Sequence, residues 1–130
     1  MEAARALPNG IRILIVDDEP LFVEMVQAML AAEEGIDIVA VAPNGKAAVG
    51  LAEQLDPDVI VMDVSMPVMD GIEATSRIRQ RDPDACVLIL TGGTSVDDVD
   101  RARKAGAAAY VTKDRIATDL VAEIRNLGSK

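Results

Sequence analysis

The feature that most constrains the fold of this chain is a regular alternation of short apolar runs with longer amphipathic segments. Five apolar runs of strand length occur, and most are rich in Val and Ile. They span residues 11–16, 36–41, 59–62, 86–90 and 107–111. A segment with helical spacing of its apolar residues follows each run. The first two form clear apolar stripes, at 21–30 (Leu21, Phe22, Met25, Val26, Met29 and Leu30) and at 47–55, and the other three are 71–81, 96–105 and 118–127. The pattern predicts a strand and a helix repeated five times.

Strands that alternate with helices of this length imply right-handed crossovers and a parallel sheet covered by helices on both faces. The nearly continuous apolar runs agree, because a strand buried on both faces does not alternate with polar residues. An Asp-Pro-Asp connector at 56–58 and again at 82–84 precedes the third and fourth runs, and its proline ends the helix before it. With 130 residues, we expect one α/β domain over 1–130, its core from about 10 to 127.

Chemically active side chains follow four of the five runs. They are Asp17 and Asp18 after the first run, Asp63 after the third, Thr91 after the fourth, and Thr112 and Lys113 after the fifth. Ligands of open parallel sheets bind outside the carboxyl ends of the strands. Any one of these aspartates alone would be read as a helix cap or turn residue. Together they predict three carboxylates, a hydroxyl and an ammonium at one edge of the sheet.

This combination of groups has a chemistry that uses each of them. Three adjacent carboxylates repel one another unless a cation lies between them, and oxygen ligands without His or Cys favour a hard ion such as Mg²⁺. A carboxylate beside Mg²⁺ is a competent nucleophile toward phosphorus and forms an aspartyl phosphate. Lys113 and Thr91 would contact the phosphoryl oxygens. The sequence therefore predicts phosphoryl transfer to a carboxylate.

Composition excludes several other classes of function. The chain has no His, and its 22 acidic and 13 basic residues give a net charge of −9. Without His there is no Ser-His-Asp or Cys-His catalysis and no His-ligated zinc. So acidic a domain is not expected to bind nucleic acid directly. The single Cys forms no internal disulfide, and we find neither a signal peptide nor a membrane span. We therefore expect a soluble, cytoplasmic domain without membrane contacts.

Four motifs, in order, resemble those of response-regulator receiver domains, the phospho-accepting part of two-component signalling. They are IVDDEP (15–20), VMDVSMPVMDG (61–71), LILTGG (88–93) and KAGAAAYVTKD (104–114). The resemblance implies a CheY-like, flavodoxin-like (βα)5 fold with a five-stranded parallel sheet in the order 2-1-3-4-5. The phrases DDEPLF, DGIEATSRIRQ and KAGAAAYVTKD are closest to receivers of LuxR-type helix-turn-helix regulators.

The resemblance also implies residue roles at the site. Asp63 would be the phosphorylation site, and Lys113 would bind the phosphate. Asp17, Asp18, Asp63 and the main-chain carbonyl of Ser65 would hold Mg²⁺, the one cofactor that we expect.

A conformational switch is implied as well. Thr91 and Tyr110 match the switch pair of the family, and Pro67 would shape the loop after the phosphorylated strand. Phosphorylation would draw Thr91 toward the phosphoryl group and let Tyr110 turn inward, which changes the face formed by the fourth helix, fifth strand and fifth helix. Asp114 stands where many receivers have Pro after the lysine, so the isomer of that peptide bond is open.

The resemblance implies a sensor histidine kinase or a phosphotransfer protein as the partner, since the chain itself has no His. The domain would catalyse only its own phosphorylation and dephosphorylation. The output stays open between an attached effector domain, a downstream partner and a phosphorylation-dependent homodimer. The main alternative is a constitutive docking module that phosphorylation does not regulate. An aspartate-nucleophile phosphatase is disfavoured because Ser65 replaces its general acid, and a flavodoxin-like cofactor binder because Asp17 and Asp18 repel phosphate.

Overall fold

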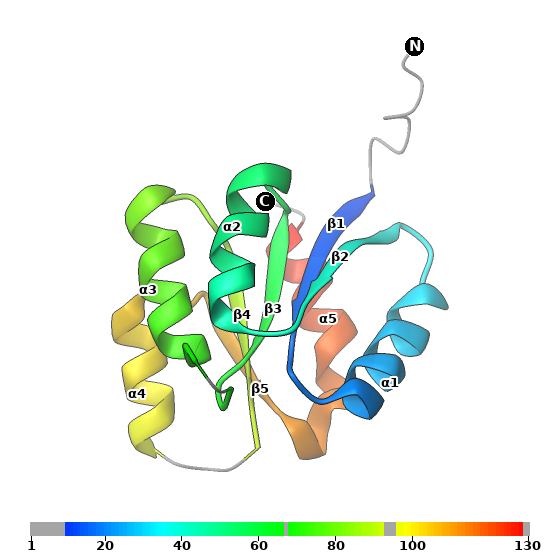
Figure 1. Cartoon of the computed structure of the whole chain (residues 1–130). Helices are drawn as coiled ribbons and strands as arrows, with labels where there is room; N and C mark the ends of the chain where they lie inside the picture. Colours follow the sequence, from blue (N-terminus) through cyan, green and yellow to red (C-terminus); the bar gives the residue numbers. More distant parts are fainter. Residues whose placement is uncertain (1–9, 67, 93–95, 129–130) are drawn as a thin grey trace.

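The computed structural model describes residues 10–66, 68–92 and 96–128, in which five strands alternate with five helices (Figure 1). In chain order the elements are β1 (Ile11–Val16), α1 (Pro20–Ala31), β2 (Ile36–Ala42), α2 (Gly45–Leu55), β3 (Val59–Asp63), α3 (Gly71–Arg81), β4 (Val87–Thr91), α4 (Val96–Ala105), β5 (Ala109–Thr112), the 3-10 turn η2 (Lys113–Arg115) and α5 (Ile116–Gly128). Pro67, for which the sequence predicted a loop-shaping role, lies outside the described residues.

The five strands form one parallel sheet in the order β2-β1-β3-β4-β5, which confirms the expected strand order. Helices α1 and α5 cover one face of the sheet, and α2, α3 and α4 cover the other (Figure 1). Alternate side chains of β1 enter the two buried clusters: Ile13 and Ile15 face α1 and α5, whereas Leu14 and Val16 face the other three helices. Burial on both faces explains why the strands read as continuous apolar runs.

The bounds of four strands differ from the predicted apolar runs, and β2 differs only in ending one residue later, at Ala42. Strands β3 and β4 continue by one residue to include Asp63 and Thr91, because parallel pairing continues past the apolar residues: Asp63 pairs with Leu90 and Thr91 with Thr112. Strand β4 begins one residue later than predicted, at Val87. Strand β5 begins two residues later than predicted, at Ala109, and ends one residue later, at Thr112. Three of the polar residues that the sequence placed just after the strands, Asp63, Thr91 and Thr112, are therefore held within the sheet.

One predicted helix face was partly wrong. The sequence assigned Leu21 and Met25 to the apolar stripe of α1, but their exposed fractions are 73% and 42%. The buried residues of this helix are Val23, Val26 and Leu30, which are spaced by three and four residues and share one face. The predicted stripe spans too wide an arc for one helix to bury, so its outer edge faces solvent.

One point about the backbone that the sequence left open is answered. No peptide bond in the described residues is cis, so the bond between Lys113 and Asp114 is trans. None of the helices in this part of the chain combines the length and the apolar character needed to cross a membrane.

Candidate functional site

Three carboxylates meet at the carboxyl edge of the sheet. Asp17 and Asp18 follow β1, and Asp63 ends β3, the neighbouring strand. Because Val16 pairs with Met62, the next residue on each strand, Asp17 and Asp63, lie side by side. One oxygen from each of the three carboxylates lies within 4.8 Å of the other two, and no second group of this kind occurs among the described residues. Asp17 and Asp63 are buried, each 3% exposed, whereas Asp18 is exposed.

The ammonium group of Lys113 lies against this acidic cluster, defined as Asp17, Asp18 and Asp63. Its Nζ is 3.0 Å from Oδ1 of Asp63 and 3.8 Å from Oδ2 of Asp17. Lys113 follows β5, two strands away from β3, so its long side chain must reach past the end of β4. The side chain is 30% exposed. A half-buried cation therefore faces two buried carboxylates.

The electrostatics of the cluster favour a bound cation. Burial raises the pKa of Asp17, as does nearby Asp18, although a hydrogen bond from the Glu19 N–H and the charge of Lys113 lower it. Burial likewise raises the pKa of Asp63, although a hydrogen bond from Lys113 lowers it. Oδ1 of Asp17 accepts that Glu19 N–H at 2.9 Å, but Oδ2 is buried without a hydrogen-bond partner among the described residues. A buried carboxylate oxygen without a hydrogen bond, next to two further carboxylates and with one ammonium 3.8 Å away, is the environment that a hard divalent ion stabilises.

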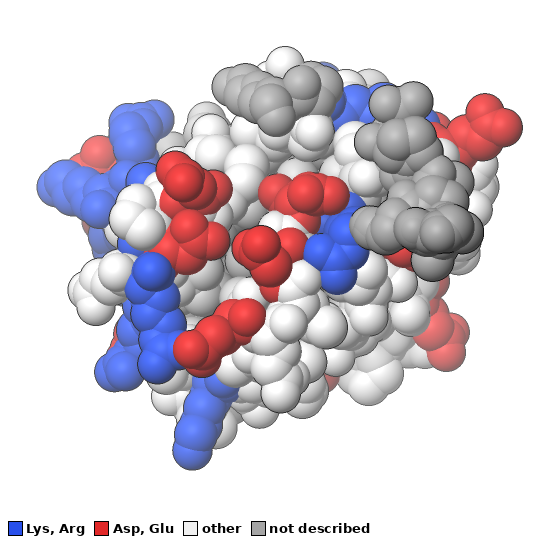
Figure 2. Space-filling model, turned by 90° about the horizontal axis from the view of Figure 1, so that it is seen from above, with Lys and Arg blue, Asp and Glu red and all other residues white. Residues whose placement is uncertain are grey.

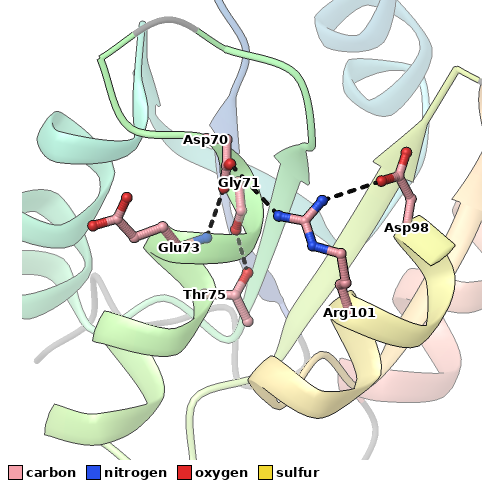
Figure 3. Close-up of polar contacts among 6 residues, drawn as sticks. All are labelled: Asp70, Gly71, Glu73, Thr75, Asp98 and Arg101. Carbon is pink, nitrogen blue, oxygen red and sulfur yellow. Dashed lines mark hydrogen bonds and ion pairs between the residues drawn. The ribbon is translucent and has the colours of Figure 1, made fainter.

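The segment after Asp63 packs directly against it at Gly71, whose polar contacts with the start of α3 are drawn in Figure 3. A Cβ atom on Gly71 would lie 2.0 Å from the carbonyl oxygen of Asp63, so only glycine fits this approach. The Gly71 N–H donates to the carbonyl of Val64 at 2.9 Å, and its own carbonyl accepts the Thr75 hydroxyl at 2.7 Å. Asp70 caps α3 by accepting the N–H of Glu73 at 2.8 Å. The start of α3 is thus fixed against the strand that carries Asp63.

Helix α4 contacts the same anchor through Arg101 (Figure 3). Its guanidinium lies 4.0 Å from Oδ2 of Asp70 and 3.4 Å from Oδ1 of Asp98. These side chains are largely exposed, so the pair contributes at most about 1 kcal/mol. It nevertheless links α4 to the loop that follows Asp63.

The remaining predicted site residues lie around the cluster. Thr91 is 3% exposed at the end of β4, the strand next to Asp63. Tyr110 lies on β5 and pairs with Ile89, two residues before Thr91, and 47% of it is exposed. Ser65 is exposed in the loop after β3. The structure therefore brings Asp17, Asp18, Asp63 and Lys113 into one group, with Tyr110 turned toward solvent.

Two residues near the cluster were not predicted as site residues. The ring of Phe22, read from the sequence only as part of an apolar stripe, lies 4.3 Å from Nζ of Lys113. Glu19 caps α1 by accepting the N–H of Phe22 at 3.0 Å. The only sequence signal that could have indicated them is their position directly after Asp17 and Asp18, at the start of the helix.

A cavity of about 280 Å³ lies at the opposite end of the sheet, where β3 and β4 begin. Apolar side chains such as Val49, Ile60 and Ile78 line it, and Glu53 and Arg81 at its border form an ion pair with each other. Figure 2 views this end of the molecule, on which acidic and basic side chains are interspersed. The cavity lies at the other end of the sheet from the acidic cluster. The cluster is the stronger candidate site, because it joins three carboxylates and an ammonium in one group.

Comparisons with known proteins identify the family of this chain. The family model described as response regulator receiver domain matches residues 13–125. The chain is 43% identical over 123 residues to the transcriptional regulatory protein PdtaR of Mycobacterium tuberculosis. The aligned region covers 95% of this chain and 58% of the relative. It is 40% identical over 117 residues to the transcriptional regulatory protein DegU of Brevibacillus brevis, covering 90% of this chain and 50% of that protein. The chain thus spans little more than half the length of these relatives.

Solved structures give the same result. A two-component response regulator of the LuxR family from Aurantimonas superposes with a TM-score of 0.88 at 36% identity, over 92% of this chain and 86% of the other. The signal receiver domain of the NarL response regulator from Mycobacterium tuberculosis gives a TM-score of 0.89 at 30% identity, over 94% and 98% of the two chains.

Proposed function

The chain belongs to the response-regulator receiver domain family, and from this premise we propose that Asp63 accepts a phosphoryl group from a phosphohistidine on a partner protein. The observation that carries the proposal is the acidic cluster itself. Three carboxylate oxygens lie within 4.8 Å of one another, and Lys113 Nζ lies 3.0 Å from Asp63. The donor is a sensor histidine kinase or a phosphotransfer protein, because the chain contains no His.

Mg²⁺ is the proposed cofactor. Asp17, Asp18 and Asp63 would hold it, together with the main-chain carbonyl of Ser65. Oδ2 of Asp17, which accepts no hydrogen bond among the described residues, and the burial that raises the pKa of both Asp17 and Asp63 support this fit. Bound Mg²⁺ would neutralise negative charge on the carboxylates and on the incoming phosphoryl oxygens.

The residues of the chain then have separate tasks. An oxygen of Asp63 attacks phosphorus, the bond between phosphorus and the imidazole nitrogen of the donor breaks, and the imidazole leaves with the bonding electron pair. Lys113 stabilises charge on the phosphoryl oxygens from the position that it already occupies beside Asp63. The Thr91 hydroxyl, at the end of the adjacent strand, donates a hydrogen bond to another of these oxygens. The domain catalyses only its own phosphorylation and dephosphorylation.

Phosphorylation then changes the surface around α4, β5 and α5. The phosphoryl group raises the charge at Asp63 to about −2 and adds three strong acceptors. Thr91 moves toward these acceptors and Tyr110, now 47% exposed, turns inward. To shift the ratio of active to inactive conformation from 1:99 to 99:1, the phosphoryl contacts must stabilise the active conformation by about 5.5 kcal/mol more than the inactive one. Two or three charge-assisted hydrogen bonds of about 1.5–3 kcal/mol each can supply it.

The biological setting is part of the same proposal. We place the domain in the cytoplasm, where it would control an attached effector domain, a downstream partner or its own dimerisation. Two of the similar proteins are named as transcriptional regulators, and the matched region is 50% of one and 58% of the other. Regulation of transcription through a DNA-binding effector is therefore the proposed output.

The test is phosphoryl uptake measured by intact mass. Incubation with acetyl phosphate and Mg²⁺ should add one phosphoryl group to the wild-type chain and none to Asp63→Asn. Asp84→Asn, which changes an exposed aspartate in the connector before β4, is the matched control and should behave like wild type. Uptake by Asp63→Asn would overturn the site assignment. A wild-type chain that folds but takes up no phosphate from acetyl phosphate or from kinases would favour the docking-module alternative.

A further inference from the structure

We propose that Phe22 is a positioning residue that holds the Lys113 ammonium beside Asp63 through the face of its ring. This inference rests on the proposed function, because it assigns a task to the lysine that would contact the phosphoryl group. It adds a residue that lies outside the acidic cluster and to which the sequence analysis gave no role at the site.

The contact itself has favourable geometry. Nζ of Lys113 lies 4.3 Å from the centroid of the Phe22 ring, inside the distance of about 6 Å at which a cation is attracted to a ring face. The same ammonium lies 3.0 Å from Asp63 and 3.8 Å from Asp17. Lys113 is therefore held from one side by two carboxylates and from another by an aromatic ring.

The backbone that carries the ring is itself held by the site. The Phe22 N–H donates to the carboxylate of Glu19 at 3.0 Å, and the Glu19 N–H donates to Oδ1 of Asp17 at 2.9 Å. Phe22 also packs against the buried cluster between the sheet and helices α1 and α5. The contacts thus form a closed circuit from Asp17 through Glu19, Phe22 and Lys113 back to Asp17. Figure 1 shows the first turn of α1 beside the segment that joins β5 to α5.

Competition for the carboxylates explains why an uncharged partner matters. A cation in the acidic cluster would draw on the same oxygens of Asp17 and Asp63 that now hold Lys113, but it would not compete for the ring. The lysine stem has four flexible bonds and the side chain is 30% exposed, so loss of its anionic partners would otherwise release it to solvent. With Phe22 in place, the ammonium stays where phosphoryl oxygens arrive.

A purely structural role for Phe22 makes different predictions. If the ring only fills space beside the core, substitutions of similar volume should be equivalent whether or not they are aromatic. If the ring face binds the ammonium, aromatic and aliphatic substitutions should separate. Phe22→Tyr keeps the ring, and Phe22→Leu and Phe22→Met remove it while preserving an apolar side chain.

The first measurement uses the wild-type chain without Mg²⁺ or phosphate. Side-chain methylene resonances of Lys113, observed by NMR, should be displaced upfield by the ring current of Phe22. The displacement should persist in Phe22→Tyr and disappear in Phe22→Leu. Lys113 resonances at ordinary positions in the folded wild-type chain would overturn the contact and with it the inference.

The second measurement is the affinity for beryllofluoride, an analogue of the phosphoryl group, in saturating Mg²⁺. Phe22→Leu should bind beryllofluoride about three- to fivefold more weakly, as expected for loss of a partly exposed cation–π contact. Its Mg²⁺ affinity, measured by calorimetry, should be unchanged, and Phe22→Tyr should match wild type in both. Should Phe22→Leu fail to fold, Phe22→Met takes its place, and thermal unfolding checks each variant.

The outcomes separate the two claims. If Phe22→Leu and Phe22→Tyr bind beryllofluoride equally well, or are weakened equally, the positioning role is wrong while the proposed function stands. If the wild-type chain binds Mg²⁺ but no beryllofluoride and takes up no phosphate, the proposed function fails and the positioning role loses its purpose.

Discussion

Replacement of Gly71 by alanine should disrupt the anchor between α3 and the strand that carries Asp63. The added Cβ would lie 2.0 Å from the carbonyl oxygen of Asp63 and 2.9 Å from Cγ of Met62, and real Cβ atoms stay at least 3.0 Å from such neighbours. The two backbone segments must therefore separate by about 1 Å, a strain that costs about 1–3 kcal/mol. Loss of the 2.9 Å hydrogen bond from Gly71 to Val64 would add about 1 kcal/mol or more.

The expected loss of stability is thus about 2–4 kcal/mol. Urea unfolding followed by circular dichroism measures it. Gly50→Ala is the matched control, because a Cβ at Gly50 in α2 meets no atom within 4 Å. There alanine should stabilise the chain by about 0.5–1 kcal/mol through its better helix propensity and more restricted unfolded state. The two glycine-to-alanine changes should therefore move stability in opposite directions.

The same change should slow phosphoryl uptake. A displacement of about 1 Å at the carbonyl of Asp63 would move its carboxylate away from Lys113, and a misplacement of this size can reduce a rate by about a hundredfold. Gly50→Ala should take up phosphate like wild type. A Gly71→Ala chain as stable as Gly50→Ala, with an unchanged uptake rate, would refute the claim that close packing at Gly71 positions Asp63.

Three further predictions concern charge at the site. Burial raises the pKa of Asp63 in the folded chain above its ordinary 3.8, so the folded chain binds this proton more tightly than the unfolded chain does. The free energy of unfolding therefore falls as pH rises from 3.8 through the raised pKa of the folded chain. Without divalent ions Asp63→Asn should therefore be more stable than wild type to urea at neutral pH but not below 3.8; a less stable variant at neutral pH would argue against this. Mg²⁺ should stabilise the wild-type chain in thermal unfolding, by about 2.7 kcal/mol at a hundredfold excess over Kd, and an equal shift in Asp17→Asn would contradict the ligand assignment. Asp70→Ala removes the 2.8 Å cap on Glu73 and should cost about 1 kcal/mol in urea unfolding, whereas Asp70→Asn should cost little.

The order of strands and helices could be predicted because burial determines it. Strands β1 and β3 are covered on both faces, so the predicted run of β3 is wholly apolar, that of β1 is interrupted only by Arg12, and both runs stand out from the helical segments. The positions of Asp17 and Asp63 at one sheet edge follow from parallel pairing alone. Their close approach is therefore a consequence of the strand order, which can be predicted from the sequence.

Contacts made by long side chains could not be predicted in this way. The spacing of residues does not say that Lys113 reaches past β4 to Asp63, nor that its ammonium stacks on Phe22. Which face of α1 is buried depends on how the helix docks against the sheet, so Leu21 and Met25 were misplaced. The link from Arg101 to Asp70 depends on the packing of α4 against α3, which no local motif records.

The most direct test of the central claim is to locate the phosphoryl group on the chain. After incubation with acetyl phosphate and Mg²⁺, borohydride reduction should convert the phosphorylated aspartate to homoserine, which peptide mass spectrometry identifies. The geometry of the acidic cluster and Lys113 predicts homoserine at position 63 and at no other aspartate. Homoserine at Asp17 or Asp18, with Asp63 unchanged, would contradict the assignment of Asp63 as the acceptor.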